Sequence, residues 1–205
     1  MSEQAVLTHF YFKQETKTEA LVFQEKSGMM EICFWKGAVC VELWDAYDRH
    51  GQKTGWTIRR GEPIPQGSFH LVSCVVVRHE DGDFLILRRS SQKEAYPNIL
   101  EIGVGGCAMQ GEDALTCAKR ELLEETGISC EALMETGRYV DHSSQAIYEG
   151  FLCVTDIRKD QIRLMPEENS AYYWYTTEEF LQFFHSDQCL DRFKRRLKDY
   201  IKTIS

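Results

Sequence analysis

Short apolar runs separated by polar turns dominate the chain and predict a series of β-strands. The strongest pair is His70–Arg78 (HLVSCVVVR) and Phe84–Arg89 (FLILRR), joined by the acidic turn Glu80–Asp83. Runs of apolar, β-branched residues around a glycine-containing turn are typical of a hairpin, and we expect this one to supply central strands of a sheet. Further strands are predicted at residues 41–48, 138–140, 146–154 and 171–175.

The pattern divides the chain into an N-terminal extension, residues 1–40, and a main domain, residues 41–205. Within the extension, apolar clusters at residues 20–23 and 31–35 flank a polar segment at 25–28, which predicts two short strands or a hairpin. In the main domain, we expect a turn at residues 50–55 (HGQKTG). Residues 59–68 contain two prolines and two glycines and are expected to form a loop.

Helical signals follow in the second half of the chain. Apolar spacing predicts a central helix over residues 113–126 with Gly127 as its C-cap, and Thr176-Thr177-Glu178-Glu179 is typical of a helix start. Residues 189–204 place apolar residues at helical spacing opposite a basic face. Strands before and after a central helix, with more helix at the end, predict a mixed α/β layer fold.

Composition and charge exclude several classes of protein. The chain has 205 residues, of which 43% are hydrophobic and 27% charged, as in ordinary globular domains. A net charge of -8 disfavours a broad nucleic-acid-binding face. No apolar run approaches the roughly 20 residues that span a bilayer, and the N-terminus lacks a secretion signal, so we expect no membrane partner and a cytoplasmic location. The eight cysteines include no C-x-x-C pair and are expected to be reduced thiols.

The predicted central helix concentrates carboxylates on one face. Relative to Glu121, Glu124 projects at about -60° and Glu125 at about +40°. The three repel one another unless they are solvated or bind a cation, and hard ions such as Mg²⁺ take oxygen ligands while bridging to phosphates. Arg120 is expected to reach Glu124 and Glu112 and to hold an acid in place. Taken alone, such a helix is also compatible with a solvated surface face.

Small residues accompany the carboxylates. Helical projection puts Ala114, Cys117 and Ala118 on the glutamate face, where they leave room for the preceding loop at residues 105–106. The same projection predicts that Leu115 and Leu122 form the stripe that faces the core.

The spacing of these residues is highly specific. Residues 106–128 satisfy the pattern G-x5-E-x7-R-E-U-x-E-E-x-G-U, in which U is aliphatic, at every position. With average residue frequencies, such a match arises by chance on the order of once in a billion start positions. The segment resembles the Nudix box of the Nudix hydrolases.

This resemblance implies an α/β/α sandwich with a mixed sheet, in which the box forms a loop-helix-loop motif. It also implies a small-molecule substrate, a nucleoside diphosphate linked to another moiety X or a related organic diphosphate, with Mg²⁺ or Mn²⁺ as cofactor. Catalytic roles are implied for Glu121, Glu124, Glu125 and Arg120, the arginine orienting rather than reacting. The implied metal-binding set is Gly106 through its carbonyl, Glu112, Glu121, Glu124, Glu125 and the outlying Glu168. Family precedent is compatible with a homodimer formed through exposed apolar residues at the N-terminus.

The flanking segments narrow the resemblance. ELWDAYDRHGQKTG, GSFHLVSCVVV and ILRRSSQKEAYPN resemble the Nudix subgroup related to type 1 isopentenyl-diphosphate isomerase, which implies that Arg89 and Lys93 contact the substrate diphosphate. The catalytic cysteine of the isomerases is matched by Gly105, and the metal histidine that follows it by Cys107. We therefore expect hydrolysis. An isomerase-like enzyme and a non-catalytic ligand-sensing module are the alternatives, and the aromatic residue that would stack on a base is left open.

Overall fold

The computed structural model describes residues 10–16, 19–26, 29–36 and 41–204, and the chain divides into two compact units, residues 1–42 and 43–205. The first unit contains an antiparallel sheet of β1 (Phe10–Thr16), β2 (Glu19–Lys26) and β3 (Met29–Lys36), in that order. β2 and β3 cover the two apolar clusters. Residues 27–28 of the polar segment between them lie outside the described residues, as do residues 1–9.

The second unit is built on a seven-stranded sheet with the order β10-β11-β6-β7-β12, to which β8 and β9 add beside β7 and β6. The strands are β6 (His70–His79), β7 (Phe84–Arg89), β8 (Leu100–Ile102), β9 (Val104–Cys107), β10 (Met134–Asp141), β11 (Ala146–Thr155) and β12 (Asn169–Tyr175). β11 and β6 run parallel, whereas the other pairs are antiparallel. The sheet is therefore mixed, as expected.

The predicted central hairpin exists, but its two strands separate soon after the turn. β6 and β7 pair only at Arg78 and Phe84, after which β9 pairs with β6 and β8 pairs with β7. Gly103 links β8 to β9 with a φ of 67°, and a Cβ there would lie 1.8 Å from the carbonyl oxygen of Val75. Only glycine fits this turn, which brings the segment before the central helix onto the middle of the sheet.

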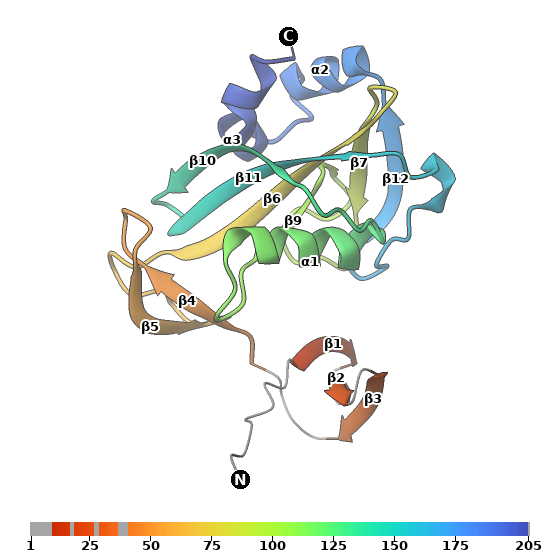
Figure 1. The fold of residues 1–205 in the computed structure, drawn as a ribbon. Coiled ribbons are helices and arrows are strands. Elements are labelled where there is room, and N and C mark those ends of the chain that lie inside the picture. The colour runs from red at the N-terminus through yellow and green to blue at the C-terminus, as the bar shows by residue number, and fades with distance from the viewer. Residues whose placement is uncertain (1–9, 17–18, 27–28, 37–40, 205) are drawn as a thin grey trace. The chain divides into compact units, whose positions relative to one another are not determined.

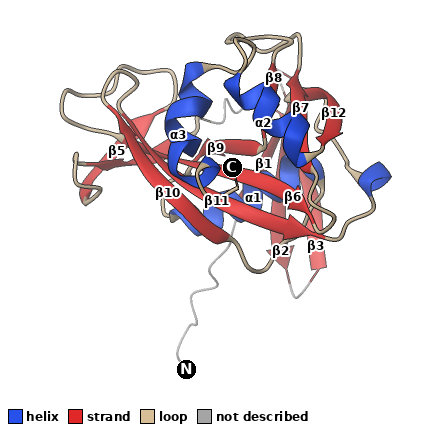
Figure 2. Ribbon diagram, turned by 90° about the horizontal axis from the view of Figure 1, so that it is seen from above, coloured by secondary structure: helices blue, strands red, loops and turns tan. Residues whose placement is uncertain are grey.

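Helices cover both faces of the sheet, as Figures 1 and 2 show: α1 (Ala114–Thr126) lies on one face, and α2 (Thr177–His185) and α3 (Asp191–Ile201) lie on the other. Strand alternation explains the two cores. Val75 packs with Leu122 of α1, whereas its neighbour Val76 packs with Phe180 of α2 and Leu197 of α3. The expected α/β/α sandwich is confirmed. Among the described residues, no helix is long and apolar enough to cross a membrane.

Two local predictions were wrong. A strand, β5 (Lys53–Arg59), begins inside the expected turn and ends at the first residue of the expected loop, and it forms a two-stranded sheet with β4 (Leu43–Tyr47). In β5 only Ile58 is buried, so its apolar pattern is too weak to predict a strand. Leu115 does not face the core, since 41% of it is exposed. The buried face of α1 is instead the small-residue face that includes Cys117, Ala118 and Leu122.

Candidate active site

Local sequence signals position α1 over the sheet. The side chain of Asp113 caps the helix by accepting a hydrogen bond from the Thr116 amide at 2.7 Å, and Gly127 ends it with a φ of 73°. The hydroxyl of Ser73 on β6 donates to the carbonyl of Ala114 at 2.7 Å. The helix is therefore fixed at both ends and tied to the central strand.

Two glycines of β9 allow the helix to approach closely. A Cβ at Gly105 would lie 2.4 Å from the carbonyl oxygen of Ser73, and one at Gly106 would lie 2.2 Å from Oε1 of Glu121. The thiol of Cys117 donates to the Gly106 carbonyl at 3.5 Å. The predicted contact between small helix residues and the glycine loop is confirmed, and the missing side chain of Gly106 is what makes room for a carboxylate.

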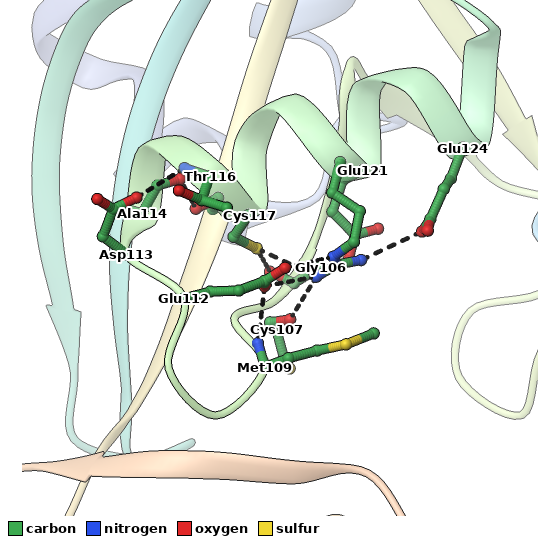
Figure 3. Close-up of polar contacts among 12 residues, drawn as sticks. Gly106, Cys107, Met109, Glu112, Asp113, Ala114, Thr116, Cys117, Glu121 and Glu124 are labelled. Atoms are coloured by element: carbon green, nitrogen blue, oxygen red, sulfur yellow. Dashed lines mark hydrogen bonds and ion pairs between the residues drawn. The ribbon is translucent and has the colours of Figure 1, made fainter. Parts of the chain in front are cut away.

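One arginine organises the carboxylates, in the region that Figure 3 draws. The guanidinium of Arg120, whose side chain is only 8% exposed, donates to Glu112 at 2.7 and 2.9 Å, to Glu121 at 2.8 Å and to Glu124 at 3.1 Å. It also donates to the carbonyl of Cys107 at 3.2 Å. Both contacts predicted from the sequence, with Glu112 and Glu124, are present, and Glu121 joins them. The carboxylates of Glu112, Glu121 and Glu124 thus share the positive charge of one guanidinium.

Burial perturbs the acids of this cluster. It raises the pKa of Glu121 to about 7, even though Arg120 acts to lower it. The pKa of Glu125, a residue only 6% exposed, is also raised well above its usual value by burial and by the charge of Glu121. The hydrogen bonds and charges of Glu112 and Glu121 raise the pKa of Arg120 against the effect of its burial. The positive charge of Arg120 therefore compensates the negative charge on the glutamate face of α1 only in part.

Glu168 and Asn169 join the cluster from the start of β12. Asn169, which is almost fully buried, donates from its side-chain amide to Oε2 of Glu125 at 2.7 Å. The carboxylate of Glu168 forms an ion pair with Lys93, and its charge raises the pKa of both Glu121 and Glu125. Glu168 therefore lies beside the helix carboxylates despite its distance along the chain.

Arg89 is held in place by other groups of the protein. Its guanidinium donates to both carboxylate oxygens of Glu101 at 2.9 Å and to the carbonyls of Ala95 and Tyr96 at 3.0–3.2 Å. Glu101 also accepts a hydrogen bond from Arg192 of α3 at 2.7 Å. Arg89 thus links the loop after β7 to β8.

A cavity of about 240 Å³ adjoins the carboxylates. Its lining includes charged residues from several elements: Arg89, Lys93, Glu101, Glu125, Glu168, Arg192 and Arg196. The structure therefore brings the predicted Arg89, Lys93, Glu125 and Glu168 to one cavity. Glu112 and Glu124 are not part of its lining and contact Arg120 instead.

Sequence reasoning missed four residues of this region: Asn169, Glu101, Arg192 and Arg196. The two arginines belong to the C-terminal helix, whose basic residues were expected on a face opposite the apolar stripe. Their spacing of four, directly before Phe193 and Leu197 of that stripe, is the signal that could have found them. Nothing in the sequence pattern distinguishes Asn169 or Glu101 from surface residues.

The donor set suits a hard divalent cation. All side-chain donors are carboxylates, and two of them are buried with raised pKa values, so an added positive charge would stabilise their ionised forms. Within the described part of the chain, however, no three His, Cys, Asp or Glu side chains converge as a ready cation site. Arg120 explains this, because it draws the carboxylates of Glu112, Glu121 and Glu124 toward itself.

Comparison with known proteins identifies the class. A family model of the NUDIX domain matches residues 68–197. The chain is 30% identical over 139 residues to an uncharacterised Nudix hydrolase, lmo0368, of Listeria monocytogenes, covering 68% of this chain and 82% of that protein. A Nudix hydrolase of Deinococcus radiodurans is 27% identical over 146 residues, covering 71% and 85%.

The solved structures agree with this family. The crystal structure of DR0079 from Deinococcus radiodurans covers 69% of this chain and 87% of its own, with a TM-score of 0.58 and 24% identity, and shows the shared fold. The chain belongs to the Nudix family and is an enzyme of the hydrolase class. Members of this family in general use divalent cations.

Proposed function

We propose that this Nudix hydrolase cleaves a diphosphate bond in a nucleoside diphosphate linked to another moiety, or in a related organic diphosphate, with Mg²⁺ or Mn²⁺. The observation that carries the proposal is the carboxylate cluster around Arg120, set beside a cavity that is lined by both acidic and basic residues. Carboxylates suit the cation, and the basic residues suit the phosphates that the cation would bridge.

In this proposal Glu121, Glu124, Glu125 and Glu168 hold the cation, with Glu112 acting through Arg120. When bound, a divalent cation neutralises diphosphate charge and lowers the pKa of a coordinated water. Glu121 and Glu124 must turn partly away from Arg120 to take part, since Arg120 is now their partner. Arg120 keeps Glu112 and the backbone of Cys107 in place while they do so.

The remaining polar residues position substrate and water. Lys93 lines the cavity and can exchange its ion pair with Glu168 for a phosphate oxygen. Arg89 is the weaker candidate for direct contact, because Glu101 and two backbone carbonyls already occupy its guanidinium. Glu125 and Glu168 line the same cavity, which supports the proposal that they also orient an attacking water.

The decisive experiment measures phosphate-containing products from a panel of nucleoside diphosphates, nucleotide sugars, dinucleotides, coenzyme A and prenyl diphosphates, with Mg²⁺ and with Mn²⁺. We expect Glu124→Gln to lower kcat at least about 100-fold with the fold intact, because metal-bound charge stabilisation is worth several kcal/mol. Glu131→Gln, an exposed glutamate outside the helix, is the matched control and should retain full activity. Absence of any turnover by the wild-type protein would contradict the proposal.

The same panel tests the two alternatives. Isomerisation of isopentenyl diphosphate is not expected, because Gly105 cannot act as the isomerase cysteine and Cys107 packs beside the cluster of Trp44, Ala46 and Ile58. His70, the retained histidine of that pattern, contacts the Gln145 carbonyl through Nδ1 at 3.0 Å. Metal-dependent binding of a panel compound without turnover would instead favour the ligand-sensing module.

A further inference from the structure

The cavity has an excess of positive charge on the side formed by α3. Its lining contains four cationic side chains, Arg89, Lys93, Arg192 and Arg196, and three carboxylates, Glu101, Glu125 and Glu168. Glu101 serves both Arg89 and Arg192, and Glu168 pairs with Lys93. Within the described residues, Arg196 is left as the cavity arginine without a carboxylate partner.

The groups that contact the guanidinium of Arg196 are aromatic rings and a thiol. Its guanidinium carbon lies 3.5 Å from the centroid of the Tyr148 ring and 6.0 Å from that of Phe193. Nη1 lies 3.7 Å from Sγ of Cys74, whose thiol stays neutral because burial raises its pKa. Nε is buried and has no hydrogen-bond partner. A guanidinium that is partly removed from water normally pairs with an anion, and no ion pair joins Arg196 to a carboxylate among the residues that the structure describes.

Arg192 extends the same surface by one helical turn. Its guanidinium lies 4.9 Å from the ring centroid of Tyr96 and pairs with Glu101, but its Nε is likewise buried without a hydrogen-bond partner. Residues four apart lie one above the other on a helix. Arg192 and Arg196 therefore bring two guanidinium groups, each with one unsatisfied donor, to the lining of one cavity.

We propose that Arg196, assisted by Arg192, binds a second anionic group of the substrate, a phosphate or carboxylate carried by the moiety X. This assignment rests on the proposed diphosphate hydrolysis and names the substrate class: diphosphates with a further negative charge on X. The geometry supports it because the cavity is lined both by Glu125 and Glu168, where the diphosphate would be cleaved, and by the α3 arginines. A guanidinium stacked on Tyr148 is also held rigid, which favours recognition of a planar or tetrahedral anion.

The first test uses metal-free protein and inorganic phosphate as the probe. In EDTA the acidic α1 cluster repels anions, so phosphate binding reports on the basic residues that line the cavity. We expect phosphate to shift the Nε–Hε resonance of Arg196 in the wild-type NMR spectrum, and Arg196→Met to weaken binding at least about 10-fold. Arg195→Met changes the same charge at an exposed neighbouring position of α3 and should alter binding less than about 2-fold.

Two results would overturn the assignment. One is an Arg196 resonance that stays unmoved at high phosphate, which requires no variant to fold. The other is an equal loss of phosphate binding in Arg195→Met and Arg196→Met. Such a result would show that phosphate responds to the total positive charge of α3 and not to Arg196 itself. Arg196→Lys keeps the charge and should retain part of the binding, so a folding defect of the methionine variant does not remove the test.

The second test compares diphosphates that differ by one phosphate on X, such as ADP-ribose 1″-phosphate with ADP-ribose. For the phosphorylated member of a pair that is hydrolysed, Arg196→Met should raise KM about 10-fold or more and leave kcat unchanged. For the other member, KM should not change. An equal change in both members would contradict the assignment. Phosphate binding with no turnover of any diphosphate would refute the proposed hydrolysis while leaving the anion site standing.

Discussion

Two arginines on opposite faces of the same sheet have contrasting surroundings. Arg120 on α1 donates to three carboxylates and one carbonyl, and its side chain is 8% exposed. Arg196 on α3 has an aromatic ring, a neutral thiol and a buried Nε without a partner. Negative charge is in excess around the first arginine and positive charge around the second. On this difference rest our two proposals, a cation bound on the α1 face and an anion bound by the α3 arginines.

The same substitution at both arginines gives the sharpest test of this contrast. Arg120→Met leaves buried carboxylates without a cation and should lower the free energy of unfolding by about 3–5 kcal/mol. Arg196→Met strands no carboxylate and keeps an apolar contact with Tyr148, so we expect a change within about 1 kcal/mol. Chemical denaturation in EDTA measures both. Equal losses of unfolding free energy in the two variants would show that the different surroundings of Arg120 and Arg196 do not affect stability.

The pH dependence of stability should reveal the acidic face. The pKa of Glu121 in the folded protein is about 7, above its ordinary value of 4.5. The folded state therefore binds more protons than the unfolded state between these two values, so stability is fully present below pH 4.5 and is lost as pH rises through about 7. Glu121 alone contributes up to about 3 kcal/mol in this direction, and Glu125 acts in the same sense.

Thermal denaturation in EDTA across this range measures the effect. We expect Tm to fall as pH rises, Mg²⁺ to restore it most strongly at the alkaline end, and Glu121→Gln to flatten the profile. A Tm that is constant or increases over the same range would show that the carboxylates around Arg120 are adequately compensated.

The smallest expected effect concerns the basic face. Glu101 is the carboxylate that neutralises both Arg89 and Arg192, so Glu101→Gln increases the positive charge of the cavity. Phosphate binding in EDTA should tighten about 3-fold, within the range of a single partly exposed charge. Glu167→Gln changes the same charge at an exposed position outside the cavity lining and serves as the control. Weaker binding in Glu101→Gln would mean that Glu101 acts by positioning the arginines rather than by offsetting their charge.

The sequence alone determined the family, the layer architecture and the local part of the site. Gly127 ends α1, and Arg120 reaches Glu112 and Glu124, because each of these interactions joins residues close along the chain. Helical geometry and hydrogen-bond chemistry suffice to predict such contacts. The strict spacing of the Nudix box predicted the family and, through it, the layer architecture.

Which surfaces meet depends on packing between distant parts of the chain. Leu115 is exposed because the sheet and the glycine strand β9 pack against the small-residue face of α1. Asn169 contacts Glu125 only because β12 lies beside this part of the fold, and Arg196 reaches the cavity only because α3 packs over the face of β6 that carries Cys74. These contacts join residues distant in sequence, and their energies depend on burial that no local pattern contains. The packing of distant segments therefore determines which charged side chains of the described residues, such as Glu125 and Arg196, lie buried or half-buried without an ion-pair partner of opposite charge.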